Sequence, residues 1–136
     1  MKIWFFYAVL SLLLYGFWGF FPKLAVKEIS PESALVYEIV GALCVGITTI
    51  LFMGFKVDFS PKGFLFAFLT GISGMVGTLF FFKATKGGPV SVVVSLTALY
   101  PLITIILGAI FLKEPITFRQ FVGMAIALFA IYLMSS

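Results

Sequence analysis

Long apolar runs separated by short polar breaks dominate the pattern of this 136-residue chain. A helix that crosses a bilayer needs about 20 predominantly apolar residues. Five runs have that character, and the first is expected to stop at Pro22-Lys23. We therefore predict five membrane-spanning helices in a single domain over residues 1–136, at about 3–21, 31–55, 62–82, 89–112 and 118–134.

Local signals at the starts of two runs support these boundaries. Ser30 can cap the second helix, Pro31 suits its first position, and Glu32 complements the positive helix start. Thr117 and Gln120 have the spacing of a capping box before the fifth run. The breaks between runs are short, so consecutive helices are expected to lie antiparallel.

Composition decides between a membrane and a soluble core. Hydrophobic residues make up 62% of the chain and charged residues 10%, whereas soluble domains carry about 25% charged residues. A chain this small cannot bury so much apolar surface by itself. The fold class predicted is an all-α integral membrane protein.

The few charged residues limit the function further. The net charge is +4, but the lysines and arginine are scattered at the ends of apolar runs and form no basic patch, so nucleic-acid binding is not expected. The chain has no histidine and one cysteine, Cys44, so we expect no metal site and no cofactor.

Helices in a bilayer pack through small residues, and two runs carry such stripes. We predict helix packing or a dimer contact at Gly74 and Gly77 in the third run, and at Gly123 and Ala127 in the fifth. Pro101 interrupts the fourth run and is either a structural kink or the hinge of a gate.

Glu38 is the one ionisable residue well inside a run. It lies roughly 10 Å along the helix from Pro31, and a charge at mid-membrane costs about 2.5 kcal/mol or more. Three interpretations remain open at this point. In the first, Glu38 carries a proton or binds a cationic substrate. In the second, it pairs with Lys23 or Lys83. In the third, it is solvated close to the interface.

The positive charges are divided almost evenly between the two sides of the predicted bundle. One side holds Lys2, Lys56, Lys62, Lys113 and Arg119, and the other holds Lys23, Lys27, Lys83 and Lys86. Because the bias of Lys and Arg sets orientation, this balance suggests insertion in both directions. Two copies would then pair as an antiparallel homodimer, an inverted repeat made from separate chains.

Three motifs follow one another along the chain. Tyr15-Gly16 precedes Lys23, Pro31 precedes Glu38 by seven residues, and the longest motif comprises Tyr100-Pro101, Gly108, Lys113-Glu114-Pro115-Ile116-Thr117, Gln120 and Gly123. Their order and spacing resemble one EamA-type half of the drug/metabolite transporter superfamily, over essentially the whole chain. Such a half often carries a Trp-Gly pair before the lysine, and it often carries an arginine at the position of Glu38.

The resemblance implies a fold and a class of activity. Most relatives fuse two inverted halves into ten helices, so a single repeat implies an antiparallel dimer that rebuilds the ten-helix unit. The family exports or exchanges small organic molecules, including amino acids, other metabolites and drugs, across the cytoplasmic membrane.

We therefore expect a secondary transporter for a small organic solute, with Glu38 exchanging a proton for a cationic or zwitterionic substrate. We expect the substrate site to lie near the midplane and to be lined by Tyr15, Trp18, Tyr37, Glu38, Thr97 and Tyr100. Two rivals remain: a non-transporting subunit that stabilises a larger membrane complex, and one half of an obligate heterodimer. An enzyme is not expected, because the sequence has no phosphate-binding glycine loop and no nucleophile beside a base.

Overall fold

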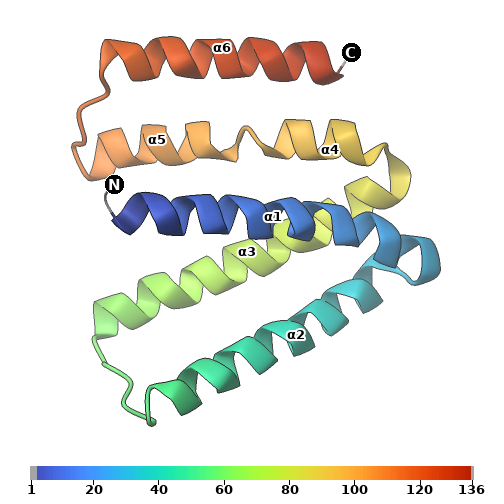
Figure 1. Ribbon diagram of the computed structural model, residues 1–136, viewed down its shortest axis with the longest axis vertical. Helices are drawn as coiled ribbons and strands as arrows, with labels where there is room; N and C mark the ends of the chain where they lie inside the picture. Colours follow the sequence, from blue (N-terminus) through green and yellow to red (C-terminus); the bar gives the residue numbers. More distant parts are fainter. Residues whose placement is uncertain (1–2, 136) are drawn as a thin grey trace. The chain divides into compact units, whose positions relative to one another are not determined.

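The computed structural model describes residues 3–135, and every regular element in that range is an α-helix (Figure 1). The helices are α1 (Ile3–Glu28), α2 (Pro31–Phe52), α3 (Pro61–Gly87), α4 (Val90–Thr97), α5 (Tyr100–Phe111) and α6 (Phe118–Ser135). They form two compact units, one of α1–α3 and one of α4–α6. Lys2, which enters the count of positive charges, lies outside the described residues.

Four stretches of the described chain are long and apolar enough to cross a membrane. They are α1, α2, α3, and α4 together with α5 over Val90–Phe111. The apolar part of α6, Phe118–Leu133, is shorter. The predicted all-helical architecture is thus confirmed for the described residues, and the fourth predicted run corresponds to two helices in line.

The ends of α2 follow from local chemistry. Ser30 adopts an extended conformation and its hydroxyl accepts a hydrogen bond from the Ser33 N–H at 3.2 Å, so the predicted cap is confirmed. The helix ends at Phe52, earlier than the predicted residue 55, because Gly54 takes a left-handed φ of 61°. The Gly54 and Phe55 amides then bond back to the Leu51 and Ile50 carbonyls, which terminates the helix.

Two other helices run further than the sequence predicts. α1 does not stop at Pro22 but continues to Glu28, because a proline inside a membrane helix removes only one backbone hydrogen bond and its fixed φ is compatible with the helix. α3 continues past residue 82 to Gly87. It ends there because Pro89 cannot donate to the next turn and disfavours helical geometry in the residue before it.

The fourth run breaks between Thr97 and Tyr100. At the break the Leu99 amide bonds to Leu96 and the Leu102 amide to Leu99, both with three-residue spacing. Pro101 has no N–H to give to the Thr97 carbonyl, and its ring crowds that carbonyl. The predicted interruption at Pro101 therefore takes the form of a short turn just ahead of the proline.

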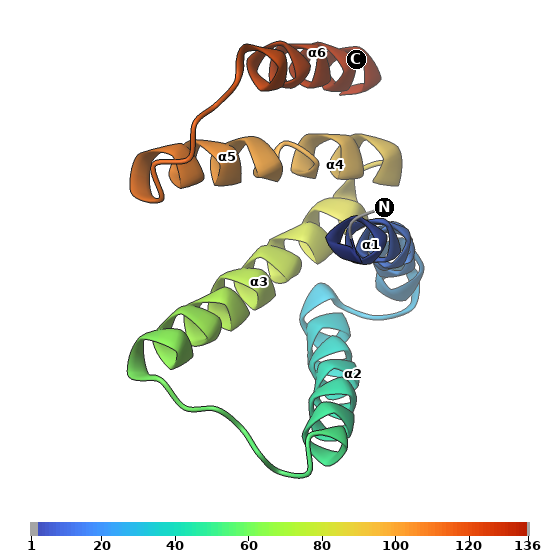
Figure 2. The ribbon, with the colours of Figure 1, turned by 60° about the vertical axis from the view of Figure 1, so that its left-hand side comes forward.

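In the first unit the three helices converge at one end. The carboxyl end of α1, the start of α2 and the end of α3 meet there, and the helices diverge away from this point (Figures 1 and 2). Val26, Ala34 and Phe82 form the buried core at the meeting point. Most other large apolar side chains are exposed, as expected where acyl chains are the solvent and packing, not water exclusion, holds helices together.

In the second unit α6 runs back alongside the α4–α5 pair and contacts α4 (Figure 1). The predicted capping box at its start is confirmed. The Thr117 N–H donates to the Gln120 side-chain oxygen at 2.8 Å, and the Gln120 N–H donates to the Thr117 hydroxyl at 3.3 Å. Two orphan donors of the first turn are satisfied in this way.

Candidate functional site: a carboxylate held inside the first unit

Glu38, on α2, is held by a residue of a different helix. The Trp18 indole N–H on α1 donates to Glu38 Oε1 at 2.8 Å. The other carboxylate oxygen, Oε2, is buried and has no hydrogen-bond partner among the described residues. A buried acceptor without a partner is costly, more so when it carries charge. A proton or a hydrogen-bond donor at Oε2 would remove this cost, whereas Oε1 already accepts from Trp18.

Trp18 is itself fixed by an aromatic neighbour. Its ring stacks on Phe81 of α3, with centroids 5.1 Å apart and an interplanar angle of 28°. Phe81 is 5% exposed, whereas Trp18 is 39% exposed. The site is thus built from one side chain of each helix in the first unit: Trp18, Glu38 and Phe81.

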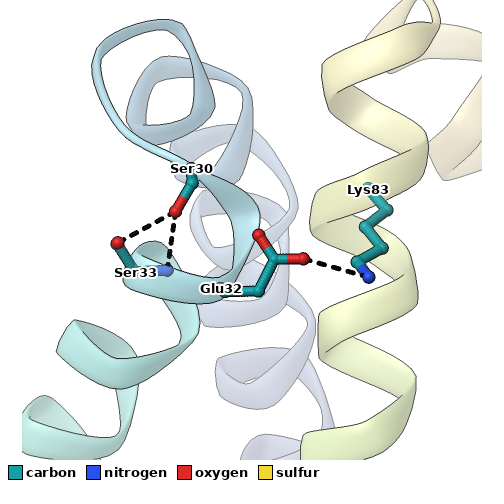
Figure 3. Close-up of polar contacts among 4 residues, drawn as sticks. All are labelled: Ser30, Glu32, Ser33 and Lys83. Carbon is teal, nitrogen blue, oxygen red and sulfur yellow. Dashed lines mark hydrogen bonds and ion pairs between the residues drawn. The ribbon is translucent and has the colours of Figure 1, made fainter.

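The two lysines considered as partners of Glu38 bond elsewhere. Lys83 forms an ion pair with Glu32 Oε1 at 3.0 Å, in the first turn of α2 and close to the Ser30 cap (Figure 3). Lys23 donates to the Thr85 carbonyl at 2.6 Å. The structure therefore does not support the interpretation in which either lysine neutralises Glu38 through a direct bond.

The remaining predicted lining residues are spread over both units. Tyr15 and Tyr37 belong to the first unit, where their side chains are 64% and 67% exposed. Thr97 and Tyr100 belong to the second unit and flank its helix break. The Thr97 hydroxyl donates to its own helix, at the Val93 and Val94 carbonyls. Only Trp18 and Glu38, of the six predicted residues, are joined by a hydrogen bond among the described residues.

The predicted packing residues have two different settings. Gly123 and Ala127 of α6 line a groove of about 330 Å³, facing Pro101 and its neighbours at the helix break. Gly74 and Gly77 have open surroundings, since a Cβ at either would meet nothing within 4 Å. Within the first unit α3 packs through larger residues instead, namely Thr78, Phe81, Phe82 and Thr85.

Sequence reasoning missed Phe81 and Thr85. Phe81 is the middle of three consecutive phenylalanines, and nothing in an all-apolar run distinguishes the one that meets a partner. Thr85 is fully buried, and its hydroxyl donates to the Phe81 and Phe82 carbonyls. Thr85 lies four residues after Phe81 and therefore on the same face of the helix, so it can be predicted to be buried once Phe81 is known to be buried.

The fold and the site define a multi-pass helical membrane protein with a carboxyl group held inside one of its spans. A model of the EamA-like transporter family matches residues 2–136, and the chain belongs to that family. The predicted resemblance and the predicted integral-membrane fold class are thereby confirmed, and the chain is a member of a family of membrane transporters.

The chain is also similar to an archaeal protein. It is 28% identical over 130 residues to an uncharacterized protein of Methanocaldococcus jannaschii, and the alignment covers 93% of this chain and 94% of that one. No solved structure matches the chain.

Proposed function

We propose that this protein is a secondary transporter of the cytoplasmic membrane, and not an enzyme, which exchanges protons for a small cationic or zwitterionic organic solute at Glu38. The observation that carries the proposal is the state of the Glu38 carboxyl group. Trp18 occupies Oε1, while Oε2 is buried without a partner among the described residues.

This arrangement suits an exchange of two cations at one acceptor. A carboxylate inside a span is expensive when it is charged and alone. A proton on Oε2 removes the charge, and an ammonium group bonded at Oε2 compensates it. When the solute binds, the carboxylic acid releases its proton, and when the solute leaves, a proton returns. The two ligands therefore compete, which couples their movements in opposite directions.

We further propose that two copies pair in opposite orientations to complete the transport path. The even division of positive charge between the two predicted sides of the bundle supports this arrangement. In the dimer Tyr15, Tyr37, Thr97 and Tyr100 would line the path around Glu38. The open surroundings of Gly74 and Gly77 would permit close approach of the second copy, and the break ahead of Pro101 would act as the hinge of a gate.

The test is uptake into proteoliposomes, with radiolabelled amino acids and organic cations screened at two pH values. Glu38→Gln keeps the size of the side chain and an acceptor for Trp18 but removes the titrating group, so pH-driven uptake should be lost. Glu32→Gln is the matched control, because Glu32 lies six residues earlier on the same helix and is 60% exposed beside Lys83. It should retain uptake.

The outcomes of the uptake assay distinguish the proposed transporter from a non-transporting membrane subunit. Unchanged pH-driven uptake by Glu38→Gln would remove Glu38 from the mechanism. An equal loss in Glu32→Gln would mean that any carboxylate of α2 matters, which contradicts the assigned role. Absence of flux for every probe, with stoichiometric co-purification of a different membrane protein, would favour the non-transporting subunit.

A further inference from the structure

Three consecutive phenylalanines near the end of α3 have three different environments. Phe80 is 65% exposed. Phe82 is 4% exposed and belongs to the core with Val26 and Ala34. Phe81 is 5% exposed and stacks on Trp18 at 5.1 Å. The three phenylalanines are chemically identical, but one is on the surface, one packs in the core and one contacts the Glu38 site.

The Phe81 contact bears on the orientation of the indole ring. Trp18 has two side-chain torsions, and two contacts restrain them: the ring face against Phe81 and the N–H bonded to Glu38 Oε1. An aromatic pair of this kind is stabilised beyond the area that it buries. Without a ring at position 81, the indole loses the surface that keeps its N–H directed at α2.

We infer that Phe81 is a positioning residue: it holds the Trp18 indole so that Oε1 of Glu38 stays occupied and Oε2 is the oxygen that receives the proton or the cationic group. This inference rests on the proposed function of Glu38. It assigns a role to Phe81, the side chain that α3 contributes to the site.

Three other charged side chains of these helices have bonding partners other than Glu38. Lys23 of α1 bonds to the Thr85 carbonyl, and Glu32 of α2 pairs with Lys83 of α3. Among the described residues, the hydrogen bond that reaches the Glu38 carboxyl group comes from Trp18, at Oε1. A change in the orientation of the indole ring should therefore directly weaken the hydrogen bond to Glu38 Oε1.

The experiment observes the Trp18 indole N–H by NMR in detergent micelles. The chain contains two tryptophans, so Trp4→Phe leaves Trp18 as the single indole signal. In this background Glu38→Leu removes the acceptor and defines the chemical shift of the unbonded indole. Phe81→Leu should move the signal in the same direction, whereas Phe81→Tyr, which keeps a ring, should leave it close to the parent position.

The flanking phenylalanines serve as controls. Phe80→Leu and Phe82→Leu should leave the indole signal near the parent position, although Phe82→Leu should lower stability because it opens the core. A parent-like signal in Phe81→Leu, with a shifted signal in Glu38→Leu, would overturn the positioning role. An equal shift in Phe81→Leu and Phe82→Leu would also overturn it, since the effect would then be general loosening.

The measurement needs no transported solute, so it stands apart from the uptake assay. If uptake fails while the indole signal responds as expected, the positioning contact stands and the transport role falls. If Glu38→Leu leaves the signal unchanged, the Trp18–Glu38 bond is absent in the micelle and the positioning inference falls with it.

Discussion

Replacing Lys23 by methionine should weaken the attachment of α1 to α3, for a reason that begins with Pro89. In a regular helix the Thr85 carbonyl would accept from the amide of residue 89, four positions on. Pro89 has no N–H, so this acceptor is left open in the last turn of α3. Lys23 Nζ fills it at 2.6 Å, and its positive charge lies favourably at a helix carboxyl end.

The size of the effect follows from the burial of the two partners. Thr85 is fully buried, so its carbonyl cannot turn to water when the lysine is removed, and Lys23 is half-buried. Hydrogen bonds with a charged partner contribute about 1.5–3 kcal/mol in soluble proteins. Side-chain hydrogen bonds measured within a bilayer reach at most about 1.7 kcal/mol. We therefore expect Lys23→Met to lower the free energy of unfolding by about 1–1.5 kcal/mol.

The assay is reversible unfolding in mixed micelles of dodecylmaltoside and sodium dodecyl sulfate, followed by far-ultraviolet circular dichroism. Lys27→Met is the matched control, because Lys27 lies four residues later on α1 and is exposed. Its effect should stay within about 0.5 kcal/mol, the range for surface substitutions. Equal destabilisation by the two substitutions would refute the role given to the Thr85 carbonyl.

Two further predictions concern the second unit and the orientation of the chain. Thr117→Val should lower the free energy of unfolding by about 1 kcal/mol, because it removes half of the capping box. Thr104→Val is the control and should be nearly neutral in the same unfolding assay. Among the described contacts, the Thr104 hydroxyl bonds only within its own helix, at 3.3 Å. In a Cys44→Ala background, Lys86→Cys and Lys113→Cys should each react with an impermeant maleimide from outside intact cells. Reaction at one position alone would exclude insertion in both orientations.

The helical membrane fold can be predicted from the amino-acid sequence alone. The length of each apolar run depends only on neighbours along the chain and on bilayer thickness, so hydropathy is enough to recognise the five runs. The caps at Ser30 and Thr117 are predictable for the same reason, since their partners lie three residues away. Glu38 stands out because a charge inside an apolar run is expensive wherever it sits.

Which side chains meet depends instead on how the helices pack. Trp18 lies 20 residues from Glu38 in sequence, and Lys23 lies 62 residues from Thr85. Such pairs depend on the angle at which helices cross and on where each one ends. The extension of α1 beyond Pro22 shifts the turn and with it the position of α2. In an apolar run every residue is equally suited to lipid, so hydropathy cannot single out Phe81 from its neighbours, and only contact with Trp18 does so.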